Sequence, residues 1–295
     1  MELRAFGQTG LRVSALGLGA MHIANPGLDD AEVGALLNGA LDLGCTLIDT
    51  ARSYGLSEER LGRHLAQRRG EFALSTKLGY GVDGVPDWTY DCIVQGVERA
   101  LRAMRTEVID IAHLHSCPLE TLQRGEVVRA LQDCRAAGKV RAAAYSGDNA
   151  AMDFAIASGA FESVQASLSV CDQAVLAQSL SAARSQGLGF IAKRPLAGAV
   201  WRHTRAPDDP AEGHYWRRWQ AMGLSERFEG HDLGALALRF AAYQPGVSSA
   251  IVGTRRLAHL RANIAAVEQG PLPPEAVALL RRAFSPWQAQ WPAMI

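Results

Sequence analysis

Cysteine is scarce in this sequence, and its number and spacing argue against both a disulfide framework and a zinc site. The 295 residues include five cysteines, an odd number, with no CxxC pair and no cysteine and histidine at the spacing of a zinc site. We therefore expect reduced, mostly buried thiols in a cytoplasmic protein, and no metal site. The cysteines are Cys45, Cys92, Cys117, Cys134 and Cys171.

Net charge and long apolar runs are lacking as well. The 30 basic and 30 acidic side chains cancel, so the charge balance does not point to a nucleic-acid or anionic-membrane partner. No segment reaches the roughly 18 apolar residues of a membrane-spanning helix, and residues 1–10 contain no apolar core of a secretory signal. We expect a cytoplasmic protein without nucleic-acid or membrane partners.

A glycine-rich dinucleotide-binding motif is incomplete. Gly17 and Gly19 follow the first apolar segment, but Met21 and His22 stand where the third glycine of GxGxxG would be expected. The sequence therefore gives no support to a doubly wound nucleotide-binding fold.

Short apolar segments alternate with longer amphipathic ones along the chain. The short segments are apolar on both faces, as are parallel strands that helices cover. Their spacing, mostly about 25–35 residues, is that of one βα unit. Eight such segments favour a (β/α)₈ TIM barrel over an open sheet, as a single domain over residues 1–295. The expected strands are 14–18, 46–49, 72–77, 109–115, 140–146, 163–166, 189–193 and 248–252.

Capping residues give the expected helix boundaries. Asp29 and Asp30 precede a helix over 31–43, and Ser57 and Thr89 are expected to cap the next two helices. Thr121 leads into a helix that ends at Gly138.

Three segments interrupt the barrel pattern. Residues 3–13, with a turn at 7–10, are typical of a short β-hairpin that could close the bottom of the barrel. Residues 195–230 form an expected long loop after strand seven, and the tail after Phe284 is rich in Trp and Pro.

Polar side chains stand where the apolar segments end. Asp49, Lys77 and His115 end three successive segments, and Tyr54 follows in the loop after Asp49. In a TIM barrel the carboxyl ends of the strands hold the active site, so these groups are expected to meet at one mouth. His113 shares a face with His115 but lies deeper, and we expect it to pack or to support the site. The next three apolar segments also end in polar residues, which are Ser146, Gln165 and Lys193.

Taken in order, the segments resemble the aldo-keto reductase superfamily. The matching pieces are IDTARSYG with SEERLGRHL (48–65), LSTKLG (74–79), VIDIAHLHS (108–116), the apolar-Gln strand at Val164-Gln165, RPLAG (194–198) and PGVSSAIVGTRR (245–256) with Asn263. The resemblance implies that Asp49, Tyr54, Lys77 and His115 are the catalytic residues.

These residue types suit carbonyl reduction. A cationic Lys77 makes the Tyr54 phenol a better acid, Asp49 can anchor the lysine, and His115 can donate a hydrogen bond to a carbonyl oxygen. A nicotinamide cofactor would supply the hydride. The resemblance implies an aldehyde, ketone or sugar carbonyl as substrate, and a monomer or small homo-oligomer.

The resemblance also implies where the cofactor binds. Ser146 and Gln165 would hold the carboxamide, although Gly147 stands where the family has asparagine, with Asp148 next. Lys193 stands where the family has an aromatic residue that stacks on the nicotinamide. Arg255 could pair with a 2′-phosphate, which favours NADPH over NADH. The other expected cofactor residues are Arg194, Pro195, Leu196, Gly253, Thr254, His259 and Asn263.

Two other functions stay open. One is a cofactor-binding regulatory subunit, since some relatives resemble channel β-subunits that keep the barrel and sense redox state. The other is a sugar dehydrogenase, which would use the same residues to oxidise its substrate with NAD(P). The substrate wall is expected in the loops after strands one, four and seven and in the tail. Its candidates are His22, Trp88, Trp201, Tyr215, Trp216 and Trp291.

Overall fold

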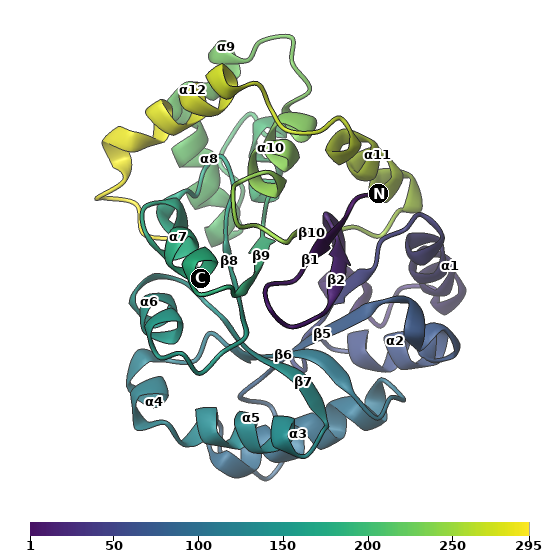
Figure 1. The fold of residues 1–295 in the computed structure, drawn as a ribbon. Helices are drawn as coiled ribbons and strands as arrows, with labels where there is room; N and C mark the ends of the chain where they lie inside the picture. The colour runs from purple at the N-terminus through teal and green to yellow at the C-terminus, as the bar shows by residue number, and fades with distance from the viewer. Residues whose placement is uncertain (295) are drawn as a thin grey trace.

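The computed structural model describes residues 1–294 and shows a ring of strands surrounded by helices (Figure 1). Eight parallel strands close into a barrel in the order β10-β3-β4-β5-β6-β7-β8-β9, which confirms the predicted TIM barrel. The barrel strands are β3 (Leu16–Gly19), β4 (Leu47–Asp49), β5 (Ala73–Leu78), β6 (Ile109–His115), β7 (Val140–Ser146), β8 (Ser163–Ser167), β9 (Gly189–Lys193) and β10 (Ser249–Gly253).

Helices follow the strands in the alternating order of a βα barrel. The α-helices are α1 (Asp30–Asp42), α2 (Ser57–Leu65), α3 (Tyr90–Ala103), α4 (Leu119–Arg124), α5 (Glu126–Ala136), α6 (Asn149–Ala157), α7 (Ser179–Ser185), α8 (Pro210–Met222), α9 (Leu224–Arg227), α10 (Leu233–Ala242), α11 (Leu257–Glu268) and α12 (Pro274–Phe284). The 3₁₀ helices are η1 (Ala20–Ile23), η2 (Ala66–Glu71), η3 (Ala174–Leu176), η4 (Ala197–Arg202) and η5 (Ser285–Trp287).

An antiparallel hairpin of β1 (Leu3–Ala5) and β2 (Arg12–Ser14) lies across the end of the barrel that faces the viewer in Figure 1. Phe6 and Val13 of this hairpin pack in one cluster with the lowest inward-facing residues of the strands. A Cβ atom on Gly189 would lie 2.7 Å from the Phe6 ring, so the absence of a side chain there admits the phenylalanine. The hairpin closes the bottom of the barrel, as expected.

The barrel interior changes from apolar to polar along its axis. Alternate residues of a strand face the same side. The residues two positions after the inward-facing Leu47, Ala73 and Ile111 therefore also point inward. On β4, β5 and β6 these are Asp49, Ser75 and His113, all buried. The polar groups therefore lie directly above an apolar floor, which consists of Leu47, Ala73, Ile111, Ala144, Ile191 and Ile251.

Several boundaries differ from the sequence-based expectation. Ser57 is not a cap: it is the first residue of α2, and its hydroxyl bonds to Thr50 Oγ1 and donates to the Ala20 carbonyl. The helix expected over 121–138 is two helices, because Gly125 adopts a φ of 76° and breaks the run. Ser14 belongs to the hairpin, so the first barrel strand begins at Leu16.

The expected long loop over 195–230 is largely helical, since it contains η4, α8 and α9. All five cysteines are buried and free in the described chain, as predicted. Within residues 1–294, no helix combines the length and apolar character that crossing a membrane requires.

The packing of α2 against the end of α3 generates the first prediction. A Cβ atom on Gly62 would lie 2.1 Å from the Ala103 carbonyl oxygen. An alanine in a helix ordinarily stabilises relative to glycine, but here it must push the helices apart, so we expect Gly62→Ala to destabilise the fold by about 1–3 kcal/mol. Gly70→Ala is the control, because nothing lies within 4 Å of its Cβ position. Chemical denaturation measures both; a Gly62→Ala variant as stable as wild type would contradict the close approach.

Candidate active site

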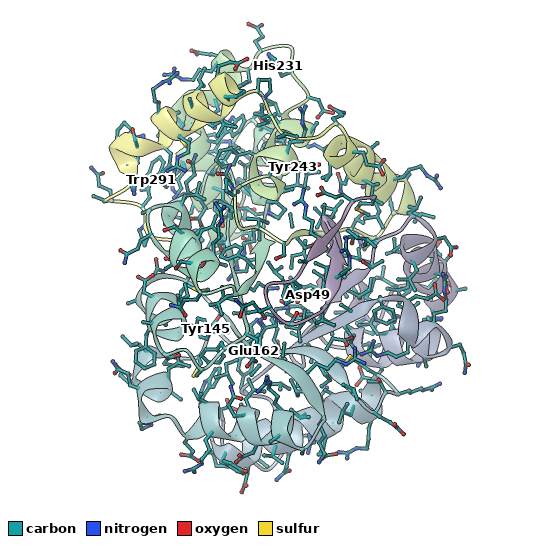
Figure 2. The ribbon with its side chains drawn as sticks, viewed as in Figure 1. Asp49, Tyr145, Glu162, His231, Tyr243 and Trp291 are labelled. Carbon is teal, nitrogen blue, oxygen red and sulfur yellow. The ribbon has the colours of Figure 1, made fainter. Side chains whose placement is uncertain are left out.

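A buried ion pair of Asp49 and Lys77 lies inside the barrel, near the carboxyl ends of β4 and β5. Figure 2 labels Asp49 and views the barrel from the hairpin end, so the mouth faces away from the viewer. Lys77 Nζ donates to Asp49 Oδ2 at 2.5 Å and to the Thr50 carbonyl at 2.7 Å. Burial is the largest single effect and would raise the pKa of Asp49, but the charge of Lys77 and the hydrogen bonds from Lys77 and Ser75 are among the effects that together lower it. Burial alone would likewise lower the pKa of Lys77, but Asp49 raises it. Both groups are therefore charged at neutral pH.

Tyr54 lies over this pair. Its backbone forms a turn, with its N–H bonded to the Ala51 carbonyl and its carbonyl accepting from Ser57 N–H, just before α2 begins. Lys77 Nζ is 5.0 Å from the centroid of the Tyr54 ring. The ring meets the His115 ring edge to face, with centroids 5.9 Å apart. The structure thus brings all four predicted catalytic side chains together.

His115 has a partner that the sequence did not reveal. Its Nδ1 lies 2.8 Å from Tyr80 Oη, and the two rings stack with centroids 5.5 Å apart. Burial, followed by the charge of Lys77, lowers the pKa of His115 to about 3, so the imidazole is neutral. When the Tyr80 hydroxyl donates to Nδ1, the single ring proton is on Nε2. The only sequence signal was an aromatic residue three positions after Lys77.

The expected carboxamide residues meet beside the ion pair. Ser146 Oγ donates to Gln165 Oε1 at 2.9 Å, and Gln165 Nε2 donates to Asp49 Oδ1 at 3.1 Å. The glycine that replaces the family asparagine has a physical reason, because a Cβ atom on Gly147 would lie 2.3 Å from Tyr145 Oη. Any larger residue at this position would displace that buried tyrosine.

Lys193 is not a solvated side chain. Its Nζ lies 2.8 Å from Asp148 Oδ2, and Asp148 also accepts from the backbone N–H of Ser167 at 2.8 Å. Burial lowers the pKa of Lys193, although the charge of Asp148 opposes the shift. The family aromatic residue is thus replaced by a second ion pair at the mouth, and Asp148 is its anionic partner.

The outer part of the predicted cofactor site lies where β10 leads into α11. Thr254 Oγ1 accepts from the backbone N–H of Arg256 at 3.1 Å. The ring of His22 covers Gly253, where a Cβ atom would lie 2.2 Å from it. Burial, followed by the charge of Arg255, lowers the pKa of His22. Arg255 is exposed and lies two residues after the end of β10.

These groups fit a nicotinamide dinucleotide. The hydroxyl and amide groups of Ser146 and Gln165 lie at the inner end, and Arg255 lies at the outer end. The first turn of α11 holds no acidic residue that would compete with a phosphate for its N–H groups. His259 is exposed and Asn263 half-buried along α11.

The segment after β9 is strained. Arg194 adopts a φ of 57°, and its carbonyl accepts from the N–H of Ala197, so Pro195 and Leu196 form a tight turn. Non-glycine residues in this conformation cost of order 1–3 kcal/mol and cluster at functional sites. This is the segment that the resemblance assigned to the cofactor.

The C-terminal tail is bound to the mouth through its backbone. The Met294 carbonyl accepts from Ser167 Oγ and Arg194 Nη1, both at 2.6 Å. The Met294 N–H donates to Asp172 Oδ2 at 2.9 Å, and Asn149 exchanges two hydrogen bonds with the backbone of Ala293. The tail therefore occupies hydrogen-bonding groups of three loops at once.

The aromatic candidates for the substrate wall mostly pack. Trp291 lies on the tail (Figure 2) and stacks on Trp287, with centroids 4.8 Å apart. Trp201 packs against Trp219 at 5.3 Å, and Tyr215 is buried. Trp216 donates to the His203 carbonyl. Trp88 packs against Tyr80, which in turn contacts His115.

Comparison with known proteins gives a consistent result. The sequence model of the Aldo/keto reductase family matches residues 15–284. The L-galactose dehydrogenase of Arabidopsis thaliana is 28% identical over 289 residues, which cover 91% of this chain and 89% of that protein. A Pseudomonas aeruginosa structure described as an aldo-keto reductase is 30% identical, covers 90% of this chain and 95% of its own, and has a TM-score of 0.71. The holo form of an aldo-keto reductase from Bacillus halodurans is 23% identical, covers 96% of each chain, and shares the fold with a TM-score of 0.83.

The tail contact at Asp172 makes stability depend on pH. Burial raises the pKa of Asp172 from 3.8 to about 7, and its Oδ1 has no hydrogen-bond partner among the described residues. Between these values the unfolded chain releases the proton and the folded chain keeps it, so stability falls as pH rises from about 4 to about 7. Asp172→Asn cannot ionise and keeps an acceptor for the Met294 N–H.

We therefore expect Asp172→Asn to raise Tm relative to wild type more at pH 8 than at pH 4. The control is Asp153→Asn, which alters an exposed carboxylate bonded to Ser179. Differential scanning calorimetry at both pH values measures the effect. An equal Tm difference at the two pH values would show that Asp172 titrates normally in the folded protein.

Proposed function

The chain belongs to the aldo/keto reductase family, whose enzymes are NAD(P)H-dependent oxidoreductases, and we propose that it uses NADPH to reduce an aldehyde, ketone or sugar carbonyl. The observation that carries the proposal is the buried Asp49–Lys77 pair beneath Tyr54, with Lys77 Nζ 5.0 Å from the phenol ring centroid. A fixed cation below a phenol stabilises the phenolate that proton donation leaves behind.

Each catalytic side chain then has one task. Bound nicotinamide supplies a hydride. The Tyr54 hydroxyl gives its proton to the carbonyl oxygen, and Lys77 stabilises the resulting phenolate. His115, neutral and protonated on Nε2, donates a hydrogen bond to the same oxygen and orients it. Asp49 keeps Lys77 charged and in place, while Tyr80 fixes the His115 tautomer.

We further propose that the cofactor is held by the residues between β7 and α11. Ser146 and Gln165 hold the carboxamide, and Lys193 lines the ring site in place of an aromatic residue. Arg255 pairs with the 2′-phosphate, which selects NADPH over NADH. The remaining contacts are Arg194, Pro195, Leu196, Gly253, Thr254, His259 and Asn263.

A second candidate is oxidation of a sugar by the same residues. The likeness to L-galactose dehydrogenase favours it. In that direction the Tyr54 phenolate accepts the hydroxyl proton, and Lys77 plays the same role. Steady-state rates with both cofactors in both directions, measured on carbonyl and sugar panels, separate the two candidates.

Removing the Tyr54 hydroxyl tests the mechanism. Tyr54→Phe keeps the ring and its packing, so we expect NADPH affinity to stay within about twofold of wild type. We expect kcat to fall by about 10²–10⁴-fold, the usual contribution of general acid catalysis. Single-turnover rates and a cofactor-fluorescence titration measure the two quantities.

Tyr90→Phe is the matched control, because this hydroxyl donates to Asp133 on α5 and makes no hydrogen bond to the predicted catalytic residues among the residues that the structure describes. It should leave kcat unchanged. A Tyr54→Phe variant with most of the wild-type kcat would show that another group donates the proton. If wild type binds NADPH but turns over no carbonyl or alcohol, the regulatory channel-subunit alternative replaces the enzyme proposal.

Arg255 tests the cofactor preference. A lost charged hydrogen-bonded contact is worth about 1.5–3 kcal/mol, so Arg255→Ala should weaken NADPH binding by about 10- to 100-fold and leave NADH binding nearly unchanged. Arg282→Ala on α12 is the control for removal of an exposed arginine. Fluorescence titration with both cofactors measures the two affinities. An Arg255→Ala variant that still prefers NADPH to the same extent would show that Arg255 does not bind the 2′-phosphate.

A further inference from the structure

We propose that His113 positions the carboxylate of Asp49 through the hydroxyl of Ser75, by a hydrogen-bond chain that runs from His113 Nε2–H to Ser75 and from Ser75 O–H to Asp49 Oδ1. The inference rests on the proposed function, in which Asp49 holds Lys77 beneath Tyr54. It gives a role to a buried histidine that the mechanism above does not use.

Counting protons fixes the direction of this chain. Ser75 Oγ lies 2.7 Å from Asp49 Oδ1 and 3.1 Å from His113 Nε2. An ionised carboxylate has no proton, so the short contact to Asp49 requires Ser75 to be the donor. A serine has one hydroxyl proton, so the remaining contact requires His113 Nε2 to donate to Ser75. The histidine is therefore the Nε2–H tautomer.

The second ring nitrogen supports the same tautomer. His113 is completely buried, two residues before His115 and directly above Ile111 of the apolar floor. Its Nδ1 has no hydrogen-bond partner among the described residues. With Nε2 protonated, the unpartnered Nδ1 carries a lone pair rather than an N–H group. Burial of this lone pair still costs free energy, which an apolar residue would not. The bond to Ser75 is a side-chain interaction that requires an N–H donor at this position, which an apolar residue would not supply.

The charged and titratable groups around His113 leave it neutral. It faces Asp49 from β4, Lys77 from β5, Lys193 from β9 and His115 from its own strand. Burial lowers the pKa of His113 to about 4. The ring therefore has a single N–H throughout the neutral range, and it serves as a fixed donor.

The chain acts on the oxygen of Asp49 that Lys77 does not contact. Lys77 binds Oδ2, whereas Oδ1 accepts from Ser75 and Gln165. Two donors on Oδ1 stabilise the ionised carboxylate and fix its rotation, and a donor to Ser75 polarises the hydroxyl and aims its proton at Asp49. Without the histidine the hydroxyl can rotate away, and the carboxylate loses a charge-assisted bond.

The first test measures the pKa of the Asp49 carboxyl group directly and does not require catalytic turnover. The carboxyl carbon of Asp49 is titrated by ¹³C NMR in wild type, Ser75→Ala, His113→Leu and His113→Gln. The loss of one charge-assisted hydrogen bond should raise the pKa of Asp49 by about one unit in Ser75→Ala and His113→Leu. His113→Gln keeps an N–H donor of similar reach and should titrate like wild type. The acidic limb of the kcat profile should move with these shifts.

Two further measurements separate the chain from ordinary packing. The double variant Ser75→Ala/His113→Leu should shift no further than Ser75→Ala alone, because His113 acts only through Ser75. The ¹⁵N spectrum of wild-type His113 should show a protonated Nε2 and an unprotonated Nδ1, a result that stands even if His113→Leu fails to fold. Circular dichroism and thermal unfolding identify such a failure.

Several results would overturn the proposal: a protonated Nδ1, additive shifts in the double variant, or a shift in His113→Gln equal to that in His113→Leu. The Asp49 titration also separates this inference from the proposed function. If wild type reduces no carbonyl while the Asp49 shifts follow the pattern above, the chain is correct and the proposed function is wrong.

Discussion

The arrangement of the barrel mouth depends on one buried ion pair, Asp49 with Lys77. Taking two charges out of water is expensive, and a buried pair persists only when its geometry is good and its remaining bonding groups are satisfied. Here Lys77 also bonds to the Thr50 carbonyl, and Asp49 accepts from Ser75 and Gln165. Removal of either charge would leave the other unpaired, which typically costs about 3–5 kcal/mol. The pair thus couples the positions of β4, β5 and β8.

Lys193 and Asp148 form a second buried ion pair at the mouth. Each of the two lysines therefore has its own carboxylate partner. The tail adds a third layer of polar contacts, since its backbone is bound by Ser167, Arg194 and Asn149.

Much of the fold could be predicted because it depends on local patterns. Segments apolar on both faces mark parallel strands, and the capping residues Asp29 and Thr89 mark helix starts that the structure confirms. The meeting of Asp49, Lys77 and His115 could be predicted because parallel strands bring their carboxyl ends to one mouth. Gly125 could not be identified as a break, since a glycine within an amphipathic run is compatible with a continuous helix. Tyr80 and Asp148 lie in loops, and the partners of loop residues depend on a backbone path that periodicity does not encode.

The charge on Lys77 is the quantity on which this account depends, and ¹⁵N NMR of its Nζ measures it directly. At pH 10.5, where an unperturbed lysine is half protonated, the account predicts that Lys77 Nζ is still mostly an ammonium group, because Asp49 raises its pKa. Exposed lysines elsewhere are the internal reference. A Lys77 ammonium group that is half deprotonated at or below pH 10.5 would show that Asp49 does not raise its pKa, and would contradict the account.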